Sequence, residues 1–117
     1  MARFESMTCE ACRAGAPAAT ADERAAFLAA HPAWTVVEAE GIPQLQRVFR
    51  FPDFRAALAF TVRVGELAER ENHHPALLTE WGRVTVRWWT HKIRGLHRND
   101  LILAARTDAL LAEADRG

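Results

Sequence analysis

The chain has 117 residues, in which 15 Lys and Arg balance 15 Asp and Glu, with five His and two Cys. Half of the residues are apolar, which excludes a disordered or fibrous chain and fits one small globular domain. A formal net charge of zero excludes the strong basic field of a dedicated nucleic-acid binder and the polybasic patch that binds an anionic membrane.

Residues 1–19 are predicted to be a tail, and residues 20–117 a single domain. The tail has no apolar run of the kind that makes a secretory signal, and no segment approaches the roughly 18 apolar residues of a membrane span. Cys9 and Cys12 form a lone Cys-x-x-Cys pair, whereas a structural zinc site needs about four ligands. Without an export signal we expect free thiols in a reducing compartment, and hence a cytoplasmic protein.

The first predicted element is a short helix over residues 20–30. Thr20 and Glu23 have the spacing of a capping box, and His31-Pro32 ends the helix. The two strands of a hairpin follow, over residues 34–37 and 44–51, with a turn at Gly41-Ile42-Pro43.

A long helix is predicted next, beginning after the N-cap Asp53 and ending near Asn72, because Pro75 disfavours helical backbone at His74. Apolar and small residues at helical spacing predict its inward face, namely Phe54, Ala57, Leu58, Thr61, Val64, Leu67 and Ala68.

The end of the chain predicts two more strands and a last helix. A short extended segment covers residues 76–80, and the strand after Gly82 presents Val84, Val86 and Trp88 on one apolar face. The last helix spans about residues 99–115 with inward Leu101, Ile102, Ala105, Ala109 and Ala112. The order α-β-β-α-β-β-α predicts an α+β domain, in which a four-stranded antiparallel sheet carries its helices on one face.

Three histidines stand where predicted elements end, which is where scaffolds commonly present functional groups. His73 and His74 follow the long helix, and His91 follows the last strand on the face opposite its apolar side. Imidazole can take and give a proton near neutral pH, so the three are candidates for acid–base catalysis. The alternative is structural: a hydrogen-bonded His-His-Pro turn and a surface histidine at the end of a strand.

A metal site is a competing interpretation of the same region. The ligand types for zinc are present in His73, His74, His91 and His97, with Glu69, Glu71 or Asp100. Their spacing matches no local metal-binding pattern, so we expect no metal. The four tryptophans are expected mainly in the core or an interface, although one at a pocket rim could stack on a flat heterocycle.

Several of these residues form a pattern that resembles a known family. The pattern consists of Ala68-Glu69-Arg70-Glu71-Asn72-His73-His74-Pro75, Trp81, Thr90-His91, Gly95-Leu96 and Asp100-Leu101, preceded by Trp34 and Phe49-Arg50-Phe51-Pro52-Asp53-Phe54. It resembles the pterin-4a-carbinolamine dehydratases over about residues 20–115. The tail around Cys9 and Cys12 also resembles bacterial members associated with phenylalanine hydroxylase.

The resemblance implies the fold predicted above, assembled as homodimers or homotetramers. It also implies a reaction, the loss of water from 4a-hydroxytetrahydropterin to give quinonoid dihydropterin, without cofactor or metal, in pterin recycling for aromatic amino acid hydroxylation. It assigns His73 and His91 as the acid–base pair and His74 to binding and orienting the pterin. Glu69 would orient a histidine or the ring, and Trp34 would wall the pocket. Asp100 matches the motif aspartate, with a favourable charge at a helix N-terminus as its alternative role.

Two positions depart from the family pattern. His97 stands where the family often has a Ser or Thr N-cap, so Asn99 is expected to cap the last helix instead. Trp81 replaces a common Tyr. Neither change touches the three histidines.

A second functional class is a binding or assembly module without catalysis. Relatives with this fold serve as partners of transcription factors or as assembly factors for other enzymes. In such a protein the histidines would be free to vary, and the presence of all three favours the enzyme.

Overall fold

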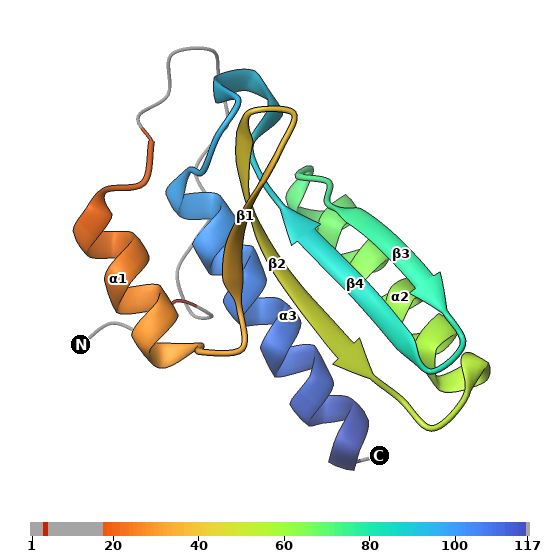
Figure 1. Ribbon diagram of the computed structural model, residues 1–117. Helices are drawn as coiled ribbons and strands as arrows, with labels where there is room; N and C mark the ends of the chain where they lie inside the picture. Colours follow the sequence, from red (N-terminus) through yellow and green to blue (C-terminus); the bar gives the residue numbers. More distant parts are fainter. Residues whose placement is uncertain (1–3, 5–17, 117) are drawn as a thin grey trace.

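The computed structural model describes Phe4 and residues 18–116, with side chains described as far as residue 113. Its elements, in chain order, are α1 (Ala21–Ala30), β1 (Thr35–Ala39), β2 (Ile42–Arg50), α2 (Phe54–Glu71), β3 (Ala76–Glu80), β4 (Arg83–Trp88), the 3-10 turn η2 (His91–Ile93) and α3 (Arg98–Arg116) (Figure 1). Cys9 and Cys12 lie outside the described residues.

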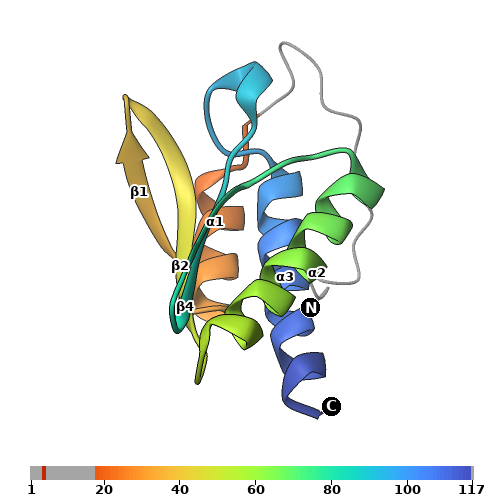
Figure 2. The same ribbon diagram turned by 90° about the vertical axis from the view of Figure 1, so that its right-hand side faces the viewer.

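The four strands form one sheet in the order β1-β2-β4-β3, and every neighbouring pair is antiparallel. All three helices lie on the same face of this sheet (Figure 2). The predicted α+β class and element order are therefore confirmed. The sheet face that points away from the helices is called the open face below.

Capping explains the beginning of α1. The Thr20 hydroxyl accepts from the Glu23 N–H at 3.0 Å, and the Glu23 carboxylate accepts from the Thr20 N–H at 2.9 Å, which confirms the predicted capping box. Arg98 at the beginning of α3 donates to the same carboxylate at 2.7 Å. The backbone hydrogen bond from Thr20, with help from Arg98, lowers the pKa of the Glu23 carboxyl below its ordinary value.

Both ends of α2 lie where the sequence predicts them. The Asp53 side chain accepts from the Ala56 N–H at 2.8 Å, and Asn72 ends the helix in the left-handed region at φ 49°. The buried stripe is Ala57, Phe60, Val64, Leu67 and Ala68.

The prediction that Phe54 and Leu58 point inward is wrong, because both are exposed. At 3.6 residues per turn, Leu58 lies more than a quarter of a turn from the centre of the stripe that Phe60, Val64 and Ala68 define.

The core lies between the sheet and the helices. The sheet contributes Leu45, Phe49, Val84, Val86 and Trp88, so the predicted inward face of β4 is confirmed. The first turns of α3 are buried continuously from Leu101 to Ala105. Ala112, predicted to point inward, is exposed where the end of α3 extends beyond the sheet (Figure 1). Among the described residues no helix is long and apolar enough to cross a membrane.

Candidate functional site

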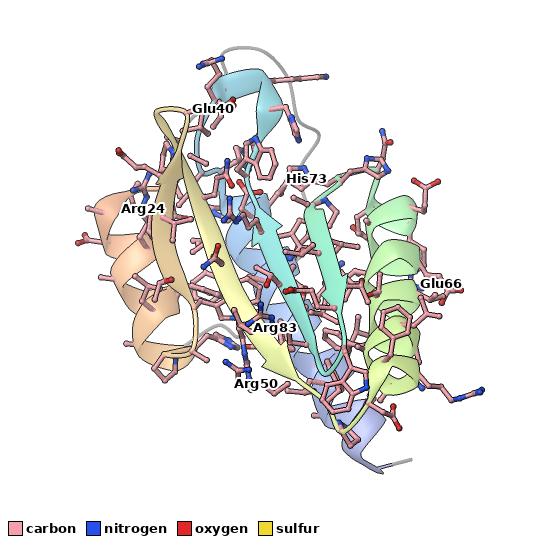
Figure 3. The ribbon with its side chains drawn as sticks, turned by 45° about the vertical axis from the view of Figure 1, so that its right-hand side comes forward. Arg24, Glu40, Arg50, Glu66, His73 and Arg83 are labelled. Carbon is pink, nitrogen blue, oxygen red and sulfur yellow. The ribbon has the colours of Figure 1, made fainter. Side chains whose placement is uncertain are left out.

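The sheet register brings the three candidate histidines to one end of the fold. Strands β3 and β4 are antiparallel with Ala76 opposite Arg87, so the residues before β3 and after β4 share the same end of the sheet. His73 and His74 lie in the connection from α2 to β3, and His91 is the first residue of η2 after β4. Figure 3 shows His73 at this end, with Arg83 toward the other.

His73 is held on two sides. Its Nε2 lies 2.7 Å from Oδ1 of Asp100, and its ring stacks on the Trp88 indole at 5.9 Å between centroids and 18° between planes. Its backbone N–H donates to the Ala68 carbonyl at 3.1 Å, which ties the histidine to the last turn of α2. Only 7% of the residue is exposed, so the ring keeps a small edge toward solvent and has a fixed orientation.

Asp100 is the centre of this network and is fully buried. Besides His73, its carboxylate accepts from the Thr90 hydroxyl at 2.7 Å and from the His97 backbone N–H at 2.9 Å. The Thr90 hydroxyl and the His97 N–H both donate to Oδ2, while Nε2 of His73 lies against the other oxygen, Oδ1. The position of Asp100 in the first turn of α3 adds a favourable interaction with the helix dipole.

His97 caps α3, and the prediction that Asn99 would do so is wrong. The Asn99 N–H donates to Nδ1 of His97 at 3.0 Å, while the His97 N–H donates to Asp100. The spacing of His97 and Asp100 therefore works as a reciprocal capping box, with an imidazole nitrogen in the place of the usual Ser or Thr hydroxyl. As a result the helix begins at Arg98, one residue earlier than predicted.

Thr90 connects the Asp100 network to His91. Its N–H donates to the Gly95 carbonyl at 2.8 Å, and the Gly95 N–H donates back to the Thr90 carbonyl at 3.3 Å, which closes a short loop around η2. His91 lies in this loop, exposed, with its ring 4.6 Å from that of Trp89. The Thr90 hydroxyl donates to the same Asp100 carboxylate that orients His73. This bond anchors the loop that carries His91.

His74 points to a second carboxylate on the surface. Its Nε2 lies 2.5 Å from Oε2 of Glu69, one turn back along α2. The side chain of His74 is 55% exposed, so it can contact a ligand that approaches this end of the sheet. Each histidine of the pair His73-His74 therefore has its own carboxylate, one buried and one exposed.

Trp34 is part of the buried core. Its buried indole packs against Phe27 and Phe49, and its Nε1–H donates to Asp108 at 3.0 Å. Asp108 also accepts from His31 at 2.7 Å and from Arg47 at 2.6 Å. Asp108 is eight residues after Asp100, or about 12 Å along α3. The structure thus places His73, His74, His91, Glu69 and Asp100 toward one end of the sheet, whereas the Trp34 indole is buried in the core and donates to Asp108.

Two contributors to the site have no assigned role in the sequence prediction: the Thr90 hydroxyl and the Trp88 ring behind His73. Trp88 is predicted only as part of the apolar face of β4. The spacing of His97 and Asp100 is that of a capping box, and this signal could have predicted that the Asp100 carboxylate turns back toward the beginning of α3. Within Phe4 and residues 18–116, no three His, Cys, Asp or Glu side chains converge closely enough to hold a metal ion.

Comparisons with known proteins identify the family. The family model described as pterin 4 alpha carbinolamine dehydratase matches residues 17–110. A protein of Syntrophotalea carbinolica named "Putative pterin-4-alpha-carbinolamine dehydratase" is 60% identical over 111 residues, covering 95% of this chain and 99% of its own length. A Gloeobacter violaceus protein, "Putative pterin-4-alpha-carbinolamine dehydratase 1", is 62% identical over 105 residues and 90% of each chain.

Solved structures share the fold. The crystal structure of a transcriptional coactivator/pterin dehydratase from Brucella melitensis superposes with a TM-score of 0.71 at 29% identity, over 80% of this chain and 98% of that one. A pterin dehydratase-like protein described as a RuBisCO assembly factor in the alpha-carboxysome has a TM-score of 0.57 at 24% identity, over 67% of this chain and 88% of that one, a likeness of fold alone. Because the family model and both sequence relatives span nearly the whole domain, the chain belongs to the pterin 4 alpha carbinolamine dehydratase family.

Proposed function

We propose that this protein is a hydro-lyase that removes water from 4a-hydroxytetrahydropterin to give quinonoid dihydropterin. The observation that carries the proposal is the buried Asp100 carboxylate, which orients His73 directly and anchors the His91 loop through Thr90. A chain that only binds a partner has no need of imidazoles aligned in this way. Membership of the family supplies the substrate class.

The chemistry of the substrate matches an acid–base pair. The C4a–O bond breaks as the hydroxyl is protonated and leaves as water, N5 loses its proton, and the C4a–N5 double bond forms. The elimination is redox-neutral and needs no electron acceptor. His73 and His91 are proposed to donate and accept these two protons, because a positioned imidazole can do either near neutral pH.

His74 and Glu69 are proposed to bind the pterin. The exposed imidazole of His74 is steadied by the Glu69 carboxylate, so its ring can meet the edge of a flat heterocycle without first becoming ordered. Trp34 is proposed to act on the pocket indirectly, as part of the wall behind β2, since its indole is buried. Asp100 is proposed to act by positioning His73.

The test is the rate at which the 4a-carbinolamine breaks down during turnover of an aromatic amino acid hydroxylase. Adding this protein is expected to accelerate the decay of the intermediate absorbance in proportion to its concentration. An unchanged rate with folded protein would contradict the dehydratase proposal and favour the binding module.

The cellular setting is proposed on separate grounds. We place the protein in the cytoplasm, recycling pterin for a hydroxylase such as phenylalanine hydroxylase. The support is the resemblance of the segment around Cys9 and Cys12 to bacterial members that accompany this enzyme.

Self-association is proposed from an apolar stripe on α2. Phe54, Leu58 and Val62 recur every four residues and are 45%, 47% and 54% exposed, so they form one line on the side of the helix away from the core. A second copy, as a homodimer or homotetramer, is the proposed occupant. A coactivator or assembly role would use the same stripe. The name of the Brucella relative describes it as both a transcriptional coactivator and a pterin dehydratase.

Replacing Leu58 by Glu is expected to reduce the molar mass in solution, because the carboxylate would lose its hydration in an apolar contact. Light scattering coupled to gel filtration measures this. Arg63→Glu is the matched control, since Arg63 is exposed on the same helix but outside the stripe. An unchanged mass for Leu58→Glu would contradict self-association through α2.

A further inference from the structure

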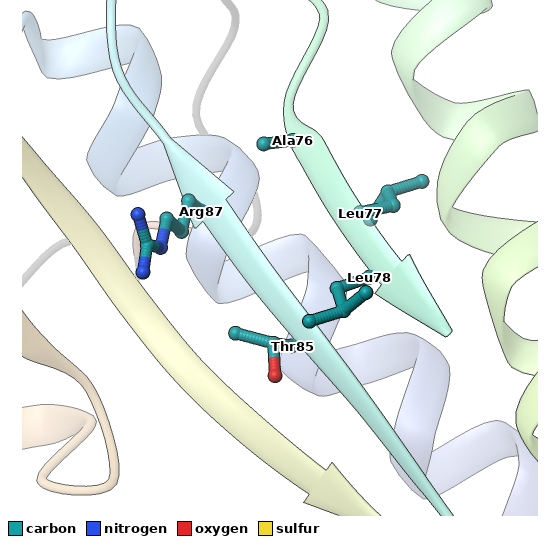
Figure 4. Close-up of a pocket in the computed structure, with 5 residues that line it drawn as sticks. All are labelled: Ala76, Leu77, Leu78, Thr85 and Arg87. Carbon is teal, nitrogen blue, oxygen red and sulfur yellow. The ribbon is translucent and has the colours of Figure 1, made fainter. Parts of the chain in front are cut away.

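The open face of the sheet has a pocket over β3 and β4, the two strands next to which the histidines lie in the chain. It has a volume of about 280 Å³ and is lined by Ala76, Leu77, Leu78, Thr85 and Arg87 (Figure 4). Ala76 and Leu78 give it an apolar floor on β3, while Thr85 and Arg87 add a hydroxyl and a guanidinium from β4. An apolar surface with a few directed polar groups is typical of a small-molecule site.

Arg87 is held in place but keeps unused donors. Its Nε–H donates to Oε1 of Gln46 on β2 at 2.7 Å, and its side chain extends from β4 toward that strand (Figure 4). Within the part of the chain that the structure describes, its two terminal nitrogens donate to no other residue. A half-buried guanidinium fixed at one nitrogen presents the others to a ligand in a defined direction.

The pocket continues from the proposed catalytic end of the sheet. Ala76 follows His74 by two residues, or about 7 Å of extended chain. On the β4 side, Arg87 precedes Trp89 by two residues, and the Trp89 ring contacts His91. A ligand that contacts the exposed His74 at the end of the sheet therefore has the pocket as its neighbour along β3.

We propose that this pocket receives the C6 substituent of the pterin, and that Arg87 selects substituents that carry oxygen acceptors. This inference rests on the proposed dehydratase function. Carbon C6 is bonded directly to N5, so in a pterin with N5 at the histidines the first atom of the C6 substituent is two bonds from N5. Ala76 and Leu78 pack against the carbon chain, and the free nitrogens of Arg87 donate to hydroxyl or phosphate oxygens on it.

The test compares three substrates: 4a-hydroxytetrahydropterins with a 6-methyl, a 6-trihydroxypropyl and a phosphorylated 6-trihydroxypropyl group. The unmodified protein is expected to favour the hydroxylated substrate over the methyl one in kcat/KM by about tenfold, as one hydrogen bond to a charged group provides. Arg87→Ala should remove this preference and leave the methyl substrate within about twofold. In Arg87→Ala, kcat/KM should fall more for the phosphorylated than for the unphosphorylated trihydroxypropyl substrate if Arg87 recognises anions. It should fall equally for these two substrates if Arg87 recognises hydroxyls.

Arg83→Ala is the matched control. Arg83 is also on β4, at the opposite end of the sheet from His73 (Figure 3), where it forms a bidentate pair with Glu80. This variant should keep the preference of the unmodified protein. Equal losses on all three substrates in Arg87→Ala, or no preference in the unmodified protein, would overturn the inference.

A second measurement separates this inference from the proposed function. Calorimetric binding of stable dihydropterins with the methyl and trihydroxypropyl groups requires no turnover. Weaker binding of the trihydroxypropyl compound alone in Arg87→Ala supports the pocket even if no dehydration is seen. Equal binding by Arg87→Ala and the unmodified protein overturns it even if dehydration is fast.

Discussion

His73→Ala and His91→Ala are each expected to lower kcat for dehydration by about 10²–10⁴, the usual contribution of a general acid or base. His73 is oriented by Asp100 and by the Trp88 ring, and His91 stands on the loop that Thr90 closes. Removing either imidazole takes away one of the two proton transfers. Stopped-flow decay of the 4a-carbinolamine with each purified variant measures the effect.

The control for these variants is His31→Ala. His31 also bonds a carboxylate of α3, Asp108, but at a distance from the proposed site, and its ring stacks on Phe27 at 4.9 Å. It should therefore lower stability without changing kcat. Turnover by both His73→Ala and His91→Ala within a few-fold of the unmodified protein would contradict the acid–base assignment. A double variant no slower than the slower single one would show that the pair acts as a unit.

Most of the fold follows from signals that are local in the sequence. The capping box at Thr20, the N-cap Asp53 and the Pro75 that follows Asn72 each fix a helix end through neighbours a few residues away. The period of two along β4 likewise identifies its buried face. The errors at Phe54 and Leu58 arise because an apolar side chain at the edge of a helix face is buried only if another element covers it. In a single chain, no element among the described residues covers Phe54 and Leu58.

The candidate site is harder to predict from the sequence than the fold, because it depends on contacts between residues far apart in the chain. The three histidines are visible as residues at element ends, but the bond from His73 to Asp100 joins positions 27 residues apart. It forms because β3 and β4 pair in one register and α3 packs against α2 and β4. The function of Thr90 is hidden for the same reason, since its hydroxyl looks like an ordinary strand residue until Asp100 is beside it.

Asp100→Asn is expected to reduce both stability and turnover. The amide keeps the size of the carboxylate but places an NH₂ group where Asp100 now only accepts from Thr90, His97 and His73. At least one of these buried donors then loses its acceptor. An unsatisfied buried polar group costs roughly 1–3 kcal/mol, so the free energy of unfolding should fall by about 1–3 kcal/mol for each donor that loses its acceptor. His73 loses its fixed orientation as well, and kcat should fall by at least about tenfold.

Asp108→Asn separates the two effects. Asp108 is on the same helix and also accepts from three donors, including a histidine, but these donors are His31, Trp34 and Arg47. Its variant should lose stability and keep its kcat. Urea denaturation gives the free energy of unfolding of both variants, and dehydration is then measured where each is fully folded. Equal kcat values for Asp100→Asn and the unmodified protein would show that Asp100 serves only the fold. A loss of kcat that occurs in Asp100→Asn and not in Asp108→Asn would make Asp100 the residue that positions His73 for proton transfer.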